Sequence, residues 1–188
     1  MTDGGSPDPT VEIVFGTAVI DDIDAFLASV REIGEETGAV VQAFDADLVV
    51  SEEALRLATR LAARAIDRGE AIARDPAVEV LLYAAGRRQI DRALQLGVSE
   101  GEVRAVAVVA DFGAVSRAER STADLPTAVD RVETLLSGGT DGSAADAWTV
   151  DENAIRELYG ITDRELDATA GDLRDVVHER IALLDVEK

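Results

Sequence analysis

The spacing of apolar residues changes along the chain between a helical and a strand period. Between Ile23 and Ile33 apolar residues recur every three or four positions, which predicts an amphipathic helix. Thr10–Phe15 is rich in Val and Ile, and Val103–Ala110 is one continuous apolar run, so both are predicted strands. Strands separated by helices predict a mixed α/β (α+β) domain with helices packed on a central mixed β-sheet of about four or five strands.

Helix caps and breakers divide the rest of the chain. Ser51, followed by two glutamates, predicts the start of a helix that runs to Arg68 and stops at Gly69. Further helices are predicted to begin at Asp75-Pro76, Arg88, Pro126, Asp151, Thr162 and Asp172. Further strands are predicted at Ala39–Phe44, at Ala147–Val150 and in the final IALLDVEK, where a helical end is the alternative.

The ends of the chain differ in composition. Residues 1–9 are rich in Gly, Pro, Ser and Asp, which predicts a disordered tail, and residues 10–188 are expected to form one compact domain. Cysteine is absent, so neither a disulfide framework nor a thiolate metal site is expected. The polar start and the short apolar runs predict neither a signal peptide nor a membrane span, which makes the cytoplasm the expected location.

The formal net charge is −20, from 38 acidic and 18 basic residues, and Lys188 is the only lysine. This balance is typical of proteins adapted to molar salt, in which surface carboxylates keep the chain hydrated while salt screens their repulsion. A functional acidic patch is the alternative. Under salt adaptation the net charge says little about partners, and local departures from the acidic background say more.

No set of residues predicts an active site. Asp111-Phe112-Gly113 matches a kinase metal-binding triplet, but the other kinase motifs are missing, so chance explains it better. His178 is the only histidine, no cysteine is present to pair with it, and the nearby Asp175 and Glu179 are more simply helix-surface charges than catalytic partners. Asp45 and Asp47 flank a strand end, where a turn-forming role is favoured over metal binding. The chain is therefore expected to be non-enzymatic, without metal or cofactor.

Arginines cluster in one part of this acidic chain. Arg56, Arg60, Arg64 and Arg68 recur every four residues along one predicted helix, and Arg87, Arg88 and Arg92 follow. A basic region of this kind indicates an anion or RNA surface. Equally, the arginines can pair with nearby carboxylates while their stems cover apolar surface. The pattern alone leaves both interpretations open.

The same segment resembles a known family. The stretch from QAFDADLVV to EVLLYAAGRRQIDRAL, together with WTVDENAIRELYGI and VVHERIALLDVEK, is similar to the small kinase-binding subunit of the KEOPS complex. The resemblance covers roughly Thr10 to Glu187, with a looser stretch near Phe112–Leu125. Its most specific pieces are AAGRRQI (84–90) and ERIALLDVEK (179–188).

The resemblance implies a non-catalytic regulatory subunit. It would bind the kinase-like ATPase subunit of KEOPS and the 3′ CCA end of tRNA, supporting threonylcarbamoyladenosine (t6A) modification without a cofactor. On this basis the expected tRNA-binding residues are Arg56, Arg60, Arg64, Arg87 and Arg88, because a guanidinium both stacks on bases and binds phosphate. Ile90 and Leu94 are expected at the kinase interface, with core packing as the alternative. A small-molecule-binding or regulatory α/β domain without an RNA role is the competing interpretation.

Overall fold

A three-stranded antiparallel sheet organises the molecule. The computed structural model describes residues 8–138 and 148–186. Strands β1 (Thr10–Ile20), β2 (Val40–Asp45) and β3 (Gly101–Asp111) pair in the order β1-β3-β2. Because β3 is central and covered on both faces, its residues Ala105–Ala110 are all buried, which explains their unbroken apolar run.

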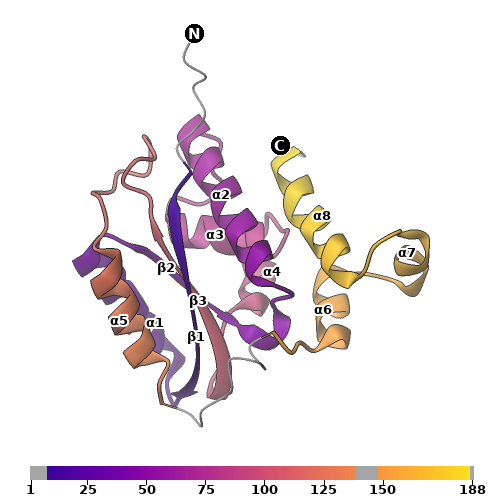
Figure 1. Cartoon of the computed structure of the whole chain (residues 1–188), viewed down its shortest axis with the longest axis horizontal. Coiled ribbons are helices and arrows are strands. Elements are labelled where there is room, and N and C mark those ends of the chain that lie inside the picture. The colour runs from indigo at the N-terminus through magenta and orange to yellow at the C-terminus, as the bar shows by residue number, and fades with distance from the viewer. Residues whose placement is uncertain (1–7, 139–147, 187–188) are drawn as a thin grey trace.

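Helices cover both faces of the sheet (Figure 1). On one face lie α1 (Ile23–Thr37) and α5 (Leu125–Leu135). On the other lie α2 (Glu52–Arg68) and α3 (Pro76–Ala84), and α8 (Leu173–Val186) packs on the outer side of α2. The remaining described helices are α4 (Ile90–Ala93), α6 (Glu152–Tyr159) and α7 (Asp163–Ala168), with 3-10 turns η1 (Ala46–Leu48) and η2 (Leu94–Leu96).

The two faces of the sheet bury separate apolar clusters. Alternate residues of β2 point to opposite sides, so Val40 and Phe44 belong to the cluster under α2 and α3. Val41 and Ala43 belong to the cluster under α1 and α5. This alternation places α1 and α3 on either side of β2, at one edge of the sheet.

The predicted caps are confirmed by hydrogen bonds. Ser51, Asp75, Asp151 and Thr162 each accept a bond from a backbone N–H in the first turn of the following helix. Asp22 caps α1 in the same way. Gly38, Gly69 and Gly160 end α1, α2 and α6 with φ values of 76°, 74° and 66°, a conformation that glycine adopts without strain. Local capping chemistry therefore fixed these boundaries.

The predicted class is confirmed, but the predicted sheet was too large and of the wrong kind. The described residues hold three strands, all antiparallel, instead of a mixed sheet of four or five. Residues 148–150 form no strand, and Ala147 lies outside the described residues. The C-terminal run is the end of α8, because Ile181 and Leu184 recur at helical spacing and pack into the core.

Residues 1–7 of the predicted tail also lie outside the described part. Within the described ranges, no helix is both long enough and apolar enough to cross a membrane.

Candidate functional site

A groove runs beside β2, between α1 and α3. We call it the β2 groove and define it by the side chains that line it, chiefly Leu27, Val30, Val41, Ala77, Val78 and Leu94. Its volume is about 360 Å³. Leu27 and Leu94 are 40% and 55% exposed, so the rim of the groove is apolar and open to solvent. Exposed apolar surface of this kind marks a site where another molecule binds.

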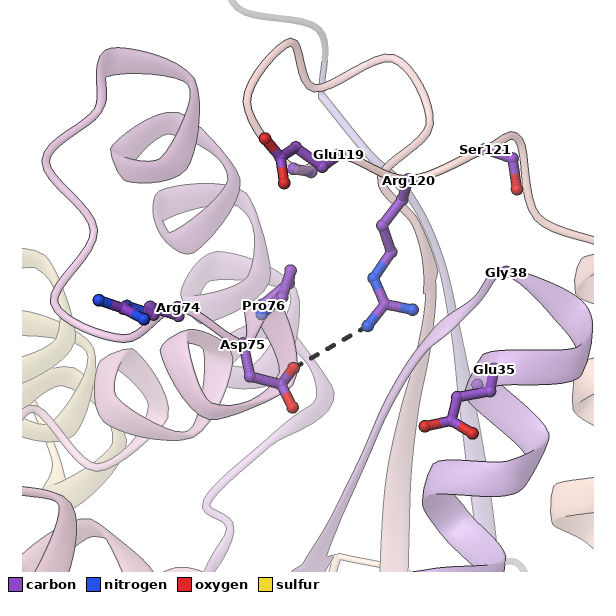
Figure 2. Close-up of a pocket in the computed structure, with 10 residues that line it drawn as sticks. Glu35, Gly38, Arg74, Asp75, Pro76, Glu119, Arg120 and Ser121 are labelled. Atoms are coloured by element: carbon purple, nitrogen blue, oxygen red, sulfur yellow. Dashed lines mark ion pairs between the residues drawn. The ribbon is translucent and has the colours of Figure 1, made fainter.

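Charged side chains gather at one end of the groove (Figure 2). Arg120 projects from the loop after β3 between Asp75, at the start of α3, and Glu35 on α1 (Figure 2). Its Nη1 donates to Ala39 O at 3.3 Å, and its Nη2 lies 4.0 Å from an Asp75 carboxylate oxygen. Glu119 stands at a φ of 51°, the only described residue other than glycine with a positive φ. Both charge signs are present here, so the groove end differs from the acidic remainder of the chain.

Ile90 and Leu94, predicted at the kinase interface, lie on the surface. Ile90, the first residue of α4, is 46% exposed, and Leu94 lies on the rim of the β2 groove. Core packing, the alternative from sequence, is therefore excluded for both side chains. Whether they contact a kinase stays a prediction.

A second opening lies where the end of α3 meets α6 and α8. We call it the arginine notch. It has a volume of about 350 Å³ and is lined by Gly86, Arg87, Tyr159, Gly160, Arg180 and Leu183. Arg87 donates from Nη2 to Leu158 O at 3.1 Å, and Arg180 donates to a Glu165 carboxylate oxygen at 2.7 Å. Each guanidinium uses some of its five N–H donors in these bonds, and the bonds hold it in place at the opening.

Two separate sequence motifs supply the arginines of the arginine notch, and WTVDENAIRELYGI supplies Tyr159 and Gly160. AAGRRQI supplies Gly86 and Arg87, and ERIALLDVEK supplies Arg180. Gly86 has a φ of 58°, and a Cβ there would lie 3.1 Å from Arg180 O, so the close approach of the two motifs favours glycine. The two most family-specific pieces of the sequence thus meet at one place.

A buried tyrosine supports the wall of the notch. Tyr159 Oη donates to Ala84 O at 2.6 Å and so ties α6 to the end of α3. Burial raises the pKa of the Tyr159 phenol, and the nearby Arg87 opposes that shift weakly. The phenol is therefore protonated at neutral pH and keeps donating this bond.

The arginine row on α2 does not form one continuous surface. An α-helix turns 100° per residue, so each four-residue step rotates the row by about 40°. Arg56 pairs with Glu52 and donates to Val11 O on β1, whereas Arg68 pairs with Glu70 and with Asp185 on α8. Arg64 Nη2 lies 3.7 Å from Asp8 Oδ1, which makes a further ion pair. The interpretation that these arginines pair with nearby carboxylates therefore describes Arg56, Arg64 and Arg68.

Arg60 and Arg88 are the other predicted tRNA-binding residues, and both are exposed. Neither the β2 groove nor the arginine notch is lined by an arginine of α2. The structure therefore separates the predicted residues into two groups, one on α2 and one at the notch. The assignment of both groups to tRNA remains a prediction.

The groups with catalytic potential have structural roles. His178 Nε2 lies 3.1 Å from Ser51 Oγ, and this hydroxyl also accepts from Ala54 N as the cap of α2. Asp45 Oδ1 accepts from Asp47 N at the start of η1, so its turn-forming role is confirmed. Burial is the main cause that raises the pKa of Asp45. In the described part of the chain, no three metal-ligating side chains converge.

Sequence reasoning missed three groups that shape these openings, namely Arg180, Arg120 and Leu27. Arg180 stands inside the quoted ERIALLDVEK motif, but its meeting with Arg87 depends on the packing of α8 against α3. Arg120 comes from an irregular loop without a periodic signal. Leu27 falls within the predicted apolar stripe of α1, and only the structure shows that it is exposed.

A mixed α/β scaffold with an apolar groove and an arginine-lined notch has the surface features of a protein that binds other macromolecules. The family model described as kinase binding protein CGI-121 matches residues 27–185. The chain belongs to this family of kinase-binding proteins. No curated protein matches the chain.

Proposed function

We propose that this protein is a non-catalytic regulatory subunit of the KEOPS complex in the cytoplasm, and that it binds the kinase-like ATPase subunit and the 3′ CCA end of tRNA. In this role it supports t6A modification, and the chemistry belongs to other subunits. The observation that carries the proposal is the match to the kinase-binding family across residues 27–185. The meeting of the two motifs that resemble the KEOPS subunit, at the arginine notch, supports the RNA part.

The kinase subunit docks on the surface around Ile90 and Leu94. Both side chains are exposed and apolar, and Leu94 continues into the rim of the β2 groove. Burying such side chains in a partner's surface removes apolar area from water, which is the main favourable contribution to protein association.

The CCA end binds at the arginine notch. The unpaired nucleotides of a tRNA 3′ end expose base faces, phosphates and 2′-hydroxyls, and Arg87 and Arg180 offer planar groups that stack and donate hydrogen bonds. Leu183 adds an apolar wall against which a base can pack. Arg88 follows Arg87 directly in the chain and is exposed, so it reaches phosphates nearby.

The α2 group, Arg56, Arg60 and Arg64, provides a second contact with the tRNA backbone. Arg60 is the strongest member, because it has neither an ion pair nor a hydrogen bond to any described residue, whereas Arg56 already binds Glu52. Phosphate contacts position a nucleic acid without reading its sequence. This group therefore adds affinity for any tRNA, and the notch adds the preference for the CCA end.

Two binding measurements test the proposal. The purified chain is first mixed with the kinase-like ATPase subunit, and a stable complex is expected on size-exclusion chromatography. It is then titrated with intact tRNA and with tRNA lacking CCA, in about 2 M KCl to suppress nonspecific attraction. Loss of binding on trimming supports the CCA assignment, and equal binding moves the RNA site elsewhere. No binding to kinase or tRNA favours the competing small-molecule or regulatory role.

A further inference from the structure

One edge of the sheet exposes unpaired backbone groups inside the β2 groove. In an antiparallel sheet, the peptide groups of successive residues in a strand point alternately toward one neighbour and the other. An edge strand therefore directs every second residue's N–H and C=O away from the sheet. The residues of β2 that do so follow from the register of the three strands and from side-chain bonds.

The register starts from β1, the opposite edge. Thr17 N donates to Leu136 O, and Val11 O accepts from Arg56. The backbone N–H and C=O groups of odd-numbered residues in β1 therefore point away from β3. Even-numbered residues of β1 then face β3, where Val14 is opposite Ala107. The odd-numbered residues of β3 therefore form backbone hydrogen bonds with β1, and its even-numbered residues form them with β2.

The same register assigns β2. Val40 is opposite Ala110 and Gln42 is opposite Val108, so the even-numbered residues of β2 bond to β3. The backbone N–H and C=O groups of Ala39, Val41 and Ala43 therefore point away from β3, toward the open edge of the sheet. Side-chain bonds agree with this result independently, because Ala39 O and Ala43 O both accept bonds from side chains and not from the backbone of β3.

Side chains satisfy the two ends of this edge. Ala39 O accepts from Arg120 and Ala39 N donates to Thr37 Oγ1 at 3.3 Å, while Ala43 O accepts from Gln42 Nε2 at 2.9 Å. Val41 N, Val41 O and Ala43 N have no hydrogen-bond partner among the described residues. Val41 and Ala43 are only 6% and 4% exposed. Backbone groups at such depth normally have a partner, which leaves the ladder incomplete at Val41, which lines the groove, and at Ala43, the next outward position along the same edge.

We propose that the β2 groove accepts an extended apolar segment of the kinase-like subunit, which adds a fourth strand to the sheet by hydrogen bonding to Val41 and Ala43. This assignment rests on the proposed function for its partner. Strand addition is a common mode of peptide recognition, in which the backbone supplies affinity and alternate side chains supply specificity.

The walls of the groove fit the two faces of an added strand. Side chains opposite Val41 and Ala43 would point to the α1 side and meet Leu27 and Val30. The side chain between them would point to the α3 side.

On the α3 side, this side chain of the added strand would meet Val78 and Leu94. Both walls are apolar, so the segment needs apolar residues on both faces. The charged lining of the same opening consists of two arginines and two carboxylates, Arg31, Arg120, Glu35 and Asp75. In a chain of net charge −20 this balance favours an uncharged segment over a basic one.

Amide hydrogen exchange of the full chain tests the inference without any substitution. We expect exchange at Val41 and Ala43 to slow by about tenfold or more when the kinase-like subunit binds, because each N–H gains an acceptor. A complex that forms while both amides exchange at their free rate would overturn strand addition and leave the proposed function intact. Failure of any complex to form would overturn both. Slowing in the free chain as its concentration rises would assign the edge to a second copy instead.

A matched pair of variants separates backbone pairing from side-chain packing. Val41→Pro removes an outward N–H that takes no part in the ladder, a position where an edge strand tolerates proline. It should weaken kinase binding at least about tenfold, whereas Val41→Ala, which keeps the N–H, should weaken it less than about threefold. Thermal unfolding of both variants is the control that tests whether the fold is retained. Equal effects of the two substitutions would contradict the backbone pairing.

Discussion

The β2 groove and the arginine notch differ in chemistry although helix α3 lines the groove and the residues just after α3 line the notch. The groove is apolar along its walls and carries balanced charge at one end. The notch presents Arg87 and Arg180 in a chain with more than twice as many acidic as basic residues. An apolar groove suits a protein segment, and a pair of guanidinium groups suits an RNA end. The comparison indicates that one small scaffold offers different surface chemistry to the two partners proposed for it.

A second comparison explains why Arg87 is favoured over the paired arginines of α2. Arg56 and Arg68 are bound by carboxylates of their own helix or its neighbours, so releasing them for RNA has a cost. Arg87 uses a neutral carbonyl, which leaves its positive charge uncompensated by that bond, whereas Arg180 is paired with Glu165 at 2.7 Å. The comparison therefore favours Arg87, and not the whole notch, over the paired arginines of α2. Regular spacing in the sequence is therefore a poorer guide to a binding site than the partners each arginine acquires on folding.

The largest expected effect comes from placing a charge on the apolar surface. Leu94→Asp should weaken kinase binding by about 30-fold or more, since a central apolar side chain can contribute about 2 kcal/mol and a buried carboxylate adds a desolvation cost. Isothermal titration calorimetry against the kinase subunit measures the change. Binding of tRNA should stay within about twofold of the wild type.

Val19→Asp is the matched control for Leu94→Asp. Val19 is 51% exposed but lies on β1, away from both openings. Kinase binding that falls equally in the two variants would show a general effect of added negative charge and would remove the support for the Leu94 surface.

The next largest effect is expected at the notch. Arg87→Ala and Arg180→Ala should each weaken binding of intact tRNA about 10-fold to 100-fold, because a charge-assisted hydrogen bond contributes about 1.5–3 kcal/mol. Filter binding in about 2 M KCl measures the affinity. Kinase binding should be unchanged in both variants, and a parallel loss of both activities would indicate misfolding.

Removing one hydroxyl should loosen the notch without changing its charge. Tyr159→Phe leaves Ala84 O without its buried donor and should lower the free energy of unfolding by about 1–2 kcal/mol. Urea denaturation followed by circular dichroism measures the change. A variant as stable as the wild type would show that the bond does not hold α6 against α3.

The smallest effect is expected on α2. Arg60→Ala should weaken tRNA binding about twofold to fivefold, and equally for intact and trimmed tRNA, because a backbone contact carries no preference for the 3′ end. Arg56→Ala is the control, expected to have a smaller effect since Arg56 is paired with Glu52. An effect of Arg60→Ala larger than that of Arg87→Ala would reverse the ranking of the two arginine groups.

Local signals in the sequence predicted the elements better than their arrangement. Caps such as Ser51 and the buried run of β3 act within a few residues, so they were readable from the sequence. The C-terminal run was misassigned because IALLDV contains both strand-forming residues and a helical apolar period. Its packing against α2 decides in favour of the helix, and that contact is not local.

The candidate site followed the same division. Arg87 and Leu94, selected from the sequence, line the notch and the groove, and Ile90, also selected, is exposed on α4. Arg180 was missed although it stands in the quoted ERIALLDVEK motif, because its meeting with Arg87 spans 93 positions and depends on the packing of α8 against the end of α3. Tertiary contacts between distant motifs are what a reading of local patterns lacks.

The central claim is tested most directly by the ratio of affinities for intact tRNA and for tRNA lacking CCA. This ratio is measured in about 2 M KCl for the wild type and for the Arg87→Ala, Arg180→Ala double variant. The account predicts at least about a tenfold preference for intact tRNA in the wild type, falling to near one in the double variant. A wild-type ratio near one, or a preference that survives both substitutions, would contradict the assignment of the CCA end to the arginine notch.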